Sequence, residues 1–344
     1  MYQALYRKWR PQTFADVIGQ QHITDTLRAQ LQSGRLSHAY LFTGTRGTGK
    51  TTCAKILARA VNCEHPVNGD PCNECAACRG ILDGSVLDVT EIDAASNNGV
   101  DNIRDLRDET RYTPAQVRKR VFIIDEVHML SIGAFNALLK TLEEPPEHVL
   151  FILATTELHK VPATILSRCQ RFDFRRIGAE DISRRLLDVA AGEGIALTEG
   201  AARLIARLAD GAMRDALSML DRAAAAGVVD EKTVTAALGV MGQDDGIRLA
   251  EHLKTGDLAA AVGLLDEYYN AGRDLASVYD QMLGLIRDAL LVKTSKTDVS
   301  ALISPAYSVK TLQALCDGLA SSTLIAWSRI ISDSLDHMRT AANR

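Results

Sequence analysis

One stretch of eight residues constrains the fold of this chain more than any other. Residues 44–51 read GTRGTGKT and fit the pattern G-x-x-x-x-G-K-[ST] at every fixed position. The apolar run AYLFTG (residues 39–44) leads into it, and a helical pattern opens at Thr51. A strand, a glycine-rich loop and a helix in this order form a cradle for phosphate groups. A glycine-rich turn that fits by chance is the alternative, and the flanking pattern argues against it.

Each residue of this loop has a predicted task. Glycines let backbone N–H groups turn inward around phosphates, and the N-terminus of the following helix adds positive potential. We expect Lys50 to reach the β- and γ-phosphates and the Thr51 hydroxyl to help hold Mg²⁺. The predicted nucleotide contacts in the loop are Gly44, Thr45, Arg46, Gly47, Thr48, Gly49, Lys50, Thr51 and Thr52.

An acidic pair ends a second buried strand. Residues 121–126 read VFIIDE, four apolar residues followed by two carboxylates. Ligands of open α/β sheets bind outside the carboxyl ends of the strands. We therefore expect Asp125 to hold Mg²⁺, directly or through water, and Glu126 to polarise the attacking water. A capping pair at the end of a strand is the alternative.

The first half of the chain alternates strand and helix patterns, which predicts a doubly wound α/β domain over residues 1–177. Continuous apolar runs favour a parallel sheet whose strands are buried on both faces. Helices are expected at 51–61, 100–110 and 132–142. The expected strands are 39–44, 87–93, 120–126, 148–156 and 171–174.

After Gly178 the sequence pattern becomes that of helices. Leucines and isoleucines recur at helical spacing, and a glycine-rich joint at 239–246 separates two helical parts. Beyond the joint Val278, Met282, Leu285 and Ile286 follow one helix face. We expect a small helical domain at 178–242 and a second one at 243–344.

Composition excludes some classes of function. The 344 residues carry a formal net charge of −4, so no global positive field attracts nucleic acid. Short basic runs occur at 118–120 and 175–176, and such runs are more often solvated surface. No apolar run has the length of a membrane span, and the opening MYQALYRKWRP has no apolar segment behind its charges. We therefore expect a cytoplasmic protein with no membrane partner.

Four of the seven cysteines form a cluster in the α/β domain. Cys63, Cys72, Cys75 and Cys78 have the number and spacing of ligands for a closed tetrahedral zinc site. A closed shell of thiolates leaves no position for substrate, so the metal would be structural and would supply folding energy to an insertion at 63–78. An iron–sulfur cluster and a redox or disulfide pair are the alternatives. Cys53 is expected to be a small buried hydrophobe.

Further positions resemble the AAA+ ATPase family. Thr155, at the end of FILATT, occupies the place of the sensor residue near the γ-phosphate, and Thr156 is the competing choice. Arg214, in GAMRDALSML, resembles the second sensor, an arginine that lid closure brings onto the phosphates. ILSRCQRF (165–172) resembles the Ser-Arg-Cys motif of clamp-loader ATPases. The resemblance implies that Arg168 is an arginine finger acting in trans on the neighbouring subunit's ATP. Taken alone, each of these residues could instead be a structural or solvent-exposed side chain without a catalytic role.

The longest matching stretches narrow the resemblance. The chain contains YRKWRPQTFADVIGQ at 6–20, then the four-cysteine insertion, EIDAASNNGVDNIR, DEVHMLS, LLKTLEEPP and ATTELHKVPATILSRCQRF. In these it resembles the tau/gamma clamp-loader subunits of bacterial DNA polymerase III, closely up to about residue 240 and more loosely over 243–344. The implied fold is an AAA+ P-loop NTPase parallel sheet with a zinc-binding insertion, a helical lid domain and an all-α collar. In this family the opening segment packs on adenine, which implies Pro11, Val17 and Ile18 as base contacts.

The resemblance implies an ATPase motor that uses ATP, Mg²⁺ and Zn²⁺. Its partners would be delta and delta-prime type subunits and copies of itself in a pentameric ring, the sliding clamp and primer–template DNA. The ring would open the clamp and load it on DNA, at the replisome in the nucleoid. The family's collar normally continues with at least one more helix, so the collar here is expected to be incomplete. Polymerase core and helicase would bind a longer form only.

Three rival functions can be weighed on the sequence. A non-enzymatic clamp-loader subunit would have lost the nucleotide chemistry, whereas Lys50, Thr51, Asp125 and Glu126 are intact. Another AAA+ DNA motor, such as a branch-migration helicase, typically ends in a basic winged-helix domain and lacks a four-thiol insertion. The family is classified with DNA-directed DNA polymerases because of the holoenzyme, but no stretch resembles a nucleotidyl-transfer site.

Overall fold

The chain divides into two compact units. One comprises residues 1–194 and 205–221, the other 195–204 and 222–344. Among the described helices, none combines the length and apolarity needed to cross a membrane. The structure is a computed structural model, which describes residues 3–225, 227–239, 243–272, 275–295, 297–299, 302–303 and 307–340.

A five-stranded parallel sheet organises the first unit, in the order β2-β3-β4-β1-β5. The interior strands β1, β3 and β4 are buried almost throughout, as the apolar runs predicted. The edge strands β2 and β5 are partly exposed, which corrects the expectation of burial on both faces: an edge strand has one neighbour, and helices cover it less completely. The strands are β1 (Ala39–Thr43), β2 (Val89–Asp93), β3 (Arg120–Asp125), β4 (Val149–Thr155) and β5 (Gln170–Asp173).

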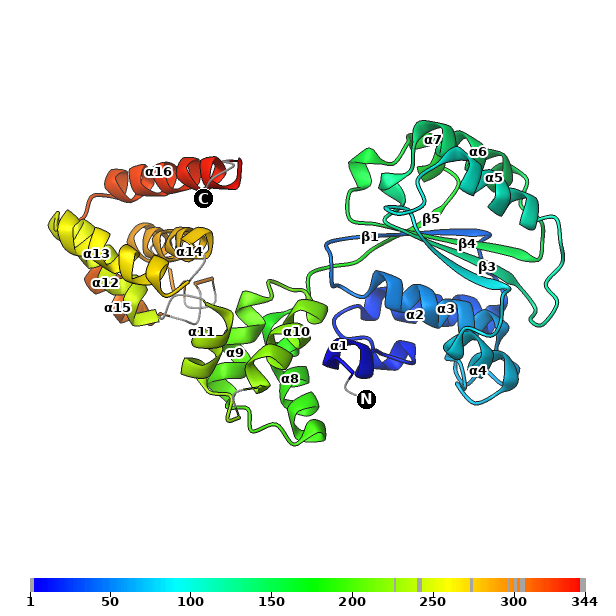
Figure 1. Cartoon of the computed structure of the whole chain (residues 1–344), viewed down its shortest axis with the longest axis horizontal. Helices are drawn as coiled ribbons and strands as arrows, with labels where there is room; N and C mark the ends of the chain where they lie inside the picture. The colour runs from blue at the N-terminus through cyan, green and yellow to red at the C-terminus, as the bar shows by residue number, and fades with distance from the viewer. Residues whose placement is uncertain are drawn as a thin grey trace. The chain divides into compact units, whose positions relative to one another are not determined.

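Helices cover both faces of this sheet (Figure 1). On one face lie α2 (Gln21–Ser33) and α3 (Lys50–Asn62), and on the other α5 (Val100–Glu109), α6 (Ile132–Glu143) and α7 (Ala163–Leu166). The alternation of side chains along each strand divides the core accordingly. On β1, for example, Tyr40 and Phe42 face α2 and α3, while Ala39 and Leu41 join the core under α5 and α6.

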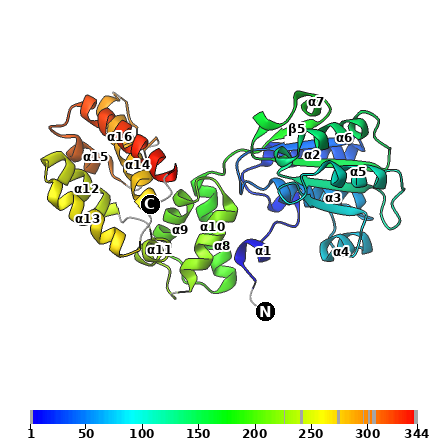
Figure 2. The ribbon, with the colours of Figure 1, turned by 45° about the horizontal axis from the view of Figure 1, so that its top comes forward.

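Short elements connect this framework. The chain opens with α1 (Leu5–Lys8), and α4 (Ala76–Asp83) lies beside α3 in both views of the ribbon (Figures 1 and 2). The unit ends with α8 and parts of the next two helices. The remaining elements of this region are η1 (Phe14–Asp16), η2 (Val127–Met129), η3 (Leu158–Lys160), α8 (Ala179–Glu193), α9 (Glu199–Leu208) and α10 (Met213–Ala224).

The second unit is built from helices around a separate apolar core. The side chains predicted to share one face, Val278, Met282, Leu285 and Ile286, are all buried there. The predicted joint at 239–246 is partly wrong, because α12 already begins at Gln243; residues 240–242 lie outside the described residues. The helices are α11 (Glu231–Leu238), α12 (Gln243–Thr255), α13 (Leu258–Asn270), α14 (Leu275–Thr294), α15 (Val309–Cys316) and α16 (Ser321–Thr340).

Candidate nucleotide site

A cavity of about 610 Å³ opens at the carboxyl end of the sheet in the first unit. It is lined by the phosphate loop from Arg46 to Thr52, by Asp125 and Glu126 after β3, and by Arg214 on α10. The predicted base contacts Pro11, Val17 and Ile18 also line it. Segments far apart in the sequence thus meet at the place where an α/β sheet binds its ligand.

The phosphate loop has the backbone that its glycines allow. Gly44 has a φ of 145°, and a Cβ there would lie 2.4 Å from the Phe174 carbonyl oxygen, so no other residue fits without moving the chain. Lys50 is buried, and its Nζ donates to the carbonyl oxygens of Gly44 (2.8 Å) and Thr45 (2.9 Å). Burial lowers the pKa of Lys50, while the nearby Glu126 and Asp125 oppose this effect.

A single contact joins the loop to the acidic pair. The Thr51 hydroxyl, at the start of α3, donates to Asp125 Oδ2 over 2.7 Å, and Asp125 Oδ1 accepts from the Glu126 backbone N–H over 3.0 Å. Hydroxyl and carboxylate oxygens are the ligand types that Mg²⁺ takes beside a nucleotide. The pair therefore fits the cation predicted from the sequence.

Glu126 is held by Thr156 rather than by Thr155. Glu126 Oε2 accepts from the Thr156 hydroxyl (3.0 Å) and backbone N–H (3.3 Å). The fully buried Thr155 hydroxyl accepts from the Glu157 N–H and lies 3.0 Å from Nδ1 of His128, a histidine that is itself 3.4 Å from Glu126 Oε2. Thr155 is absent from the cavity lining. Sequence reasoning missed His128, although it stands two residues after Glu126 in DEVH.

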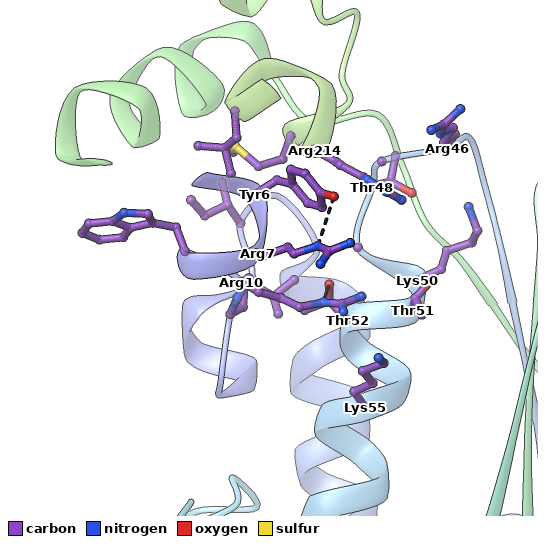
Figure 3. Close-up of a pocket in the computed structure, with 18 of the residues that line it drawn as sticks. Tyr6, Arg7, Arg10, Arg46, Thr48, Lys50, Thr51, Thr52, Lys55 and Arg214 are labelled. Carbon is purple, nitrogen blue, oxygen red and sulfur yellow. Dashed lines mark hydrogen bonds between the residues drawn. The ribbon is translucent and has the colours of Figure 1, made fainter. Parts of the chain in front are cut away.

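Cationic side chains gather around the cavity despite the net negative charge (Figure 3). The Arg214 guanidinium lies 4.9 Å from the centre of the Tyr6 ring, and Arg7 Nε donates to the Tyr6 hydroxyl over 3.1 Å. Arg10 Nε donates to the Thr52 hydroxyl over 3.2 Å, and burial lowers the pKa of Arg10. Such a surface suits an anion. Sequence reasoning overlooked Tyr6, Arg7 and Arg10, and the basic run before Pro11 was the available signal.

The four-cysteine insertion forms a separate cluster beside α3. One ligand atom from each of Cys63, Cys72, Cys75 and Cys78 lies within 4.8 Å of the others, and none forms a disulfide. Backbone N–H groups point at the sulfurs: those of Glu74 and Cys75 lie 3.5 and 3.3 Å from Cys72 Sγ and lower the pKa of Cys72 to about 6. Four convergent thiols with N–H donors fit a tetrahedral zinc ion.

Three family models match successive parts of the chain. "DNA polymerase III, delta subunit" matches 19–178, "DNA polymerase III clamp loader subunit, ATPase lid domain" matches 181–228, and "DNA polymerase III subunits gamma and tau domain III" matches 229–344. DNA polymerase III subunit gamma of Buchnera aphidicola is 43% identical over 284 residues, which cover 82% of this chain and 79% of that protein. The chain belongs to the gamma/tau family of DNA polymerase III subunits.

Longer members of the gamma/tau family are similar as well. DNA polymerase III subunit tau of Bacillus subtilis is 54% identical and that of Escherichia coli 47%, each over 296 residues, or 86% of this chain. The chain spans about half of these relatives, 53% and 46% of their lengths. Among solved structures, the RuvB Holliday junction branch migration motor of Thermotoga maritima aligns with a TM-score of 0.52 and 17% identity, covering 74% of this chain and 85% of that one. That likeness places the gamma/tau chain in the AAA+ fold.

Arg168 of this gamma/tau family member does not line the cavity of its own chain. Its guanidinium donates to Glu143 Oε1 (2.7 Å), the Thr164 carbonyl oxygen (2.8 Å) and the Ser167 hydroxyl (3.2 Å), and the side chain is about one third exposed. An arginine finger that acts in trans needs a position of this kind, outside its own site and open on one side. Its catalytic role remains a prediction.

Proposed function

We propose that this gamma/tau family member is an ATPase motor subunit of a bacterial clamp loader. It would bind and hydrolyse ATP to open the sliding clamp and load it on primer–template DNA during replication. The observation that carries the ATPase assignment is the 2.7 Å contact between Thr51 and Asp125, which joins the phosphate loop to the acidic pair in one cavity. Family membership supports the clamp-loader assignment.

The chain's own residues supply most of the proposed chemistry. Backbone N–H groups of residues 46–52, which line the cavity, would cradle the phosphates, and Lys50 would exchange its carbonyl partners for phosphate oxygens. Mg²⁺, held by Thr51 and Asp125, would neutralise charge on the phosphates when bound. Glu126 would break its hydrogen bonds with Thr156 and orient the attacking water itself. Thr155, Arg214 and, from the neighbouring subunit, Arg168 complete the proposed catalytic set.

We further propose three domains with separate tasks. Residues 1–177 form the nucleotide-binding domain, whose insertion at 63–78 binds structural zinc through its four cysteines. Residues 178–242 form the lid, and residues 243–344 belong to the collar. Family models that match 19–178, 181–228 and 229–344 support a division of this kind.

The proposed partners follow from the family. They are other clamp-loader subunits of delta and delta-prime type, copies of this chain in a pentameric ring, the sliding clamp and primer–template DNA, in the cytoplasm at the replisome. A non-enzymatic structural subunit is the second candidate, and the intact geometry around Lys50 and Asp125 favours the ATPase.

Lys50 gives the direct test. Lys50→Ala should abolish binding of a fluorescent ATP analogue in the presence of Mg²⁺, because a buried cation aimed at the phosphates is lost. Lys140→Ala, which removes an exposed lysine of α6 outside the cavity, should bind the analogue like the unaltered chain. Absence of ATP binding by the unaltered chain would favour the non-enzymatic subunit.

A further inference from the structure

The N-terminal strap, residues 10–18, lies between the nucleotide cavity and the four-cysteine insertion. On one side it lines the cavity through Arg10, Pro11, Asp16, Val17 and Ile18. The strap belongs to none of the strands of the described sheet, and its only regular structure is the three-residue η1. Its position therefore depends on side-chain anchors.

Two residues of the insertion supply anchors from the other side. Asp70 Oδ1 accepts from the Phe14 backbone N–H over 2.5 Å, and Asp70 Oδ2 accepts from Arg28 of α2 over 2.8 Å. Asn73 Nδ2 donates to the Gln12 carbonyl oxygen over 3.2 Å. Both anchors act on the strap backbone, so they fix its path whatever side chains it carries.

The anchor at Asn73 also reaches the helix that follows the phosphate loop. Arg59, a buried residue of α3, donates through Nε to Asn73 Oδ1 (3.1 Å) and through a terminal nitrogen to the Gln12 carbonyl oxygen (3.0 Å). Insertion, strap and α3 thus share one closed set of hydrogen bonds. Removing the Asn73 side chain would leave Nε–H of the buried Arg59 without its acceptor, and a buried donor that loses its hydrogen bond destabilises the arrangement.

The cysteines determine where these anchors stand. Asn73 lies between Cys72 and Cys75 with a φ of 58°, a conformation that non-glycine residues rarely adopt and that the tight turn around the thiols imposes. Asp70 lies two residues before Cys72. A metal that fixes the thiols therefore fixes the side chains that hold the strap.

We propose that the cysteine insertion positions the strap for the base and sugar of the bound nucleotide, with Asp70 and Asn73 as positioning residues. This rests on the proposed function, because it takes the cavity to be the ATP site. Metal binding at the thiols and ATP binding at the cavity are then coupled, and the coupling is reciprocal. The loop and Lys50 hold the phosphates mainly through their own groups, and the strap reaches the loop through Arg10 and the Thr52 hydroxyl. The coupling should therefore act more strongly on the base and sugar than on the phosphates.

A matched pair of variants tests the anchor. Asn73→Gly keeps the backbone conformation and removes the side chain, while Asn68→Gly makes the same change at another asparagine of the insertion with a positive φ of 53° and an exposed side chain. With zinc content verified, Asn73→Gly should weaken ATP affinity about tenfold and the affinity for inorganic tripolyphosphate by less than about twofold. Asn68→Gly should change neither affinity.

The reciprocal measurement uses metal release. ATP should slow zinc loss to a chelator several-fold in the unaltered chain, tripolyphosphate should not, and Asn73→Gly should remove the ATP effect. Asp70→Ala, which removes the second anchor, should reproduce the selective loss of ATP affinity. Equal weakening of ATP and tripolyphosphate, or unchanged ATP affinity in both variants, would overturn the coupling alone. An unaltered chain that binds neither ligand would overturn the proposed function and the coupling with it.

Discussion

Glu126 has a backbone conformation that few residues other than glycine adopt, with a φ of 48°. Its Oε2 is occupied by hydrogen bonds from Thr156. A general base must lie within hydrogen-bond reach of the water that it activates. We expect Glu126 to turn from Thr156 toward that water, which would make Thr156 a resting partner of the proposed catalytic carboxylate.

Glu126→Gln should separate binding from turnover. The amide keeps the size of the carboxylate but cannot accept a proton, so ATP affinity should stay within about twofold while hydrolysis falls at least about 100-fold. Equilibrium binding and single-turnover hydrolysis on the same preparation check both parts. Turnover close to that of the unaltered chain would assign the water-activating role to another group.

Two neighbouring threonines should give opposite results when each is changed to valine. Thr156→Val removes a hydrogen bond that holds Glu126 in its resting position. If that bond stabilises the resting position by about 1 kcal/mol, its loss lowers the activation barrier by the same amount, and basal turnover should rise roughly fivefold. Thr155→Val removes the buried hydroxyl that accepts from the Glu157 N–H and lies 3.0 Å from His128 Nδ1, which should lower the free energy of unfolding by about 1–3 kcal/mol and lower turnover. Basal ATPase assays and denaturant unfolding distinguish the two.

Residues within one motif were predictable from spacing, and residues brought in by tertiary structure were not. Lys50, Thr51 and Asp125 stand where local pattern and sheet topology place them together. Tyr6 reaches the cavity only because the N-terminal segment folds back over α3 and α10, a contact between distant segments that no local pattern contains.

At the level of elements, apolar runs predicted the strands to within two residues at each end. The run at 148–156, for example, contains β4 at Val149–Thr155. The exposure of β2 and β5 was not predictable in the same way. It depends on the order β2-β3-β4-β1-β5, in which β1 crosses to a position between β4 and β5, and strand order is set by long-range packing.

Gly69 of the insertion and Gly84, which follows α4, together test how closely the insertion packs on α2. Gly69 and Gly84 have similar φ values of 83° and 78°, so alanine meets the same backbone strain at both, about 1 kcal/mol. A Cβ at Gly69 would lie 2.9 Å from the Arg28 backbone. A Cβ at Gly84 would have no atom within 4 Å. Gly69→Ala should therefore be the more destabilising by a further 1 kcal/mol or more in denaturant unfolding.

Equal destabilisation by the two alanine variants would contradict this close packing. The insertion would then be held on the domain mainly by α3 and the strap, and the contact between Asp70 and Arg28 would contribute little. Zinc content measured on both variants controls for loss of the metal, since neither glycine supplies a ligand.

At the scale of the whole molecule, the proposed site is incomplete in one chain. The cavity contains the loop, the acidic pair and Arg214, but Arg168 lies elsewhere, held by Glu143. Ser-Arg-Cys could be recognised from the sequence as a motif. The subunit on which Arg168 acts could not be recognised in this way, because contacts between subunits leave no periodic pattern in the sequence of one chain.

Mixed assemblies should show whether Arg168 acts across a subunit boundary. Arg168→Ala should bind ATP like the unaltered chain, while hydrolysis in the assembly with clamp and primed DNA should fall about 1,000-fold at sites that face the changed subunit. Arg171→Ala, which removes a nearby exposed arginine paired with Asp173, is the matched control and should hydrolyse normally. Combining Arg168→Ala subunits with Lys50→Ala subunits should restore hydrolysis only where an intact loop meets an intact arginine. Full activity in assemblies made from Arg168→Ala alone would mean that each chain completes its own site.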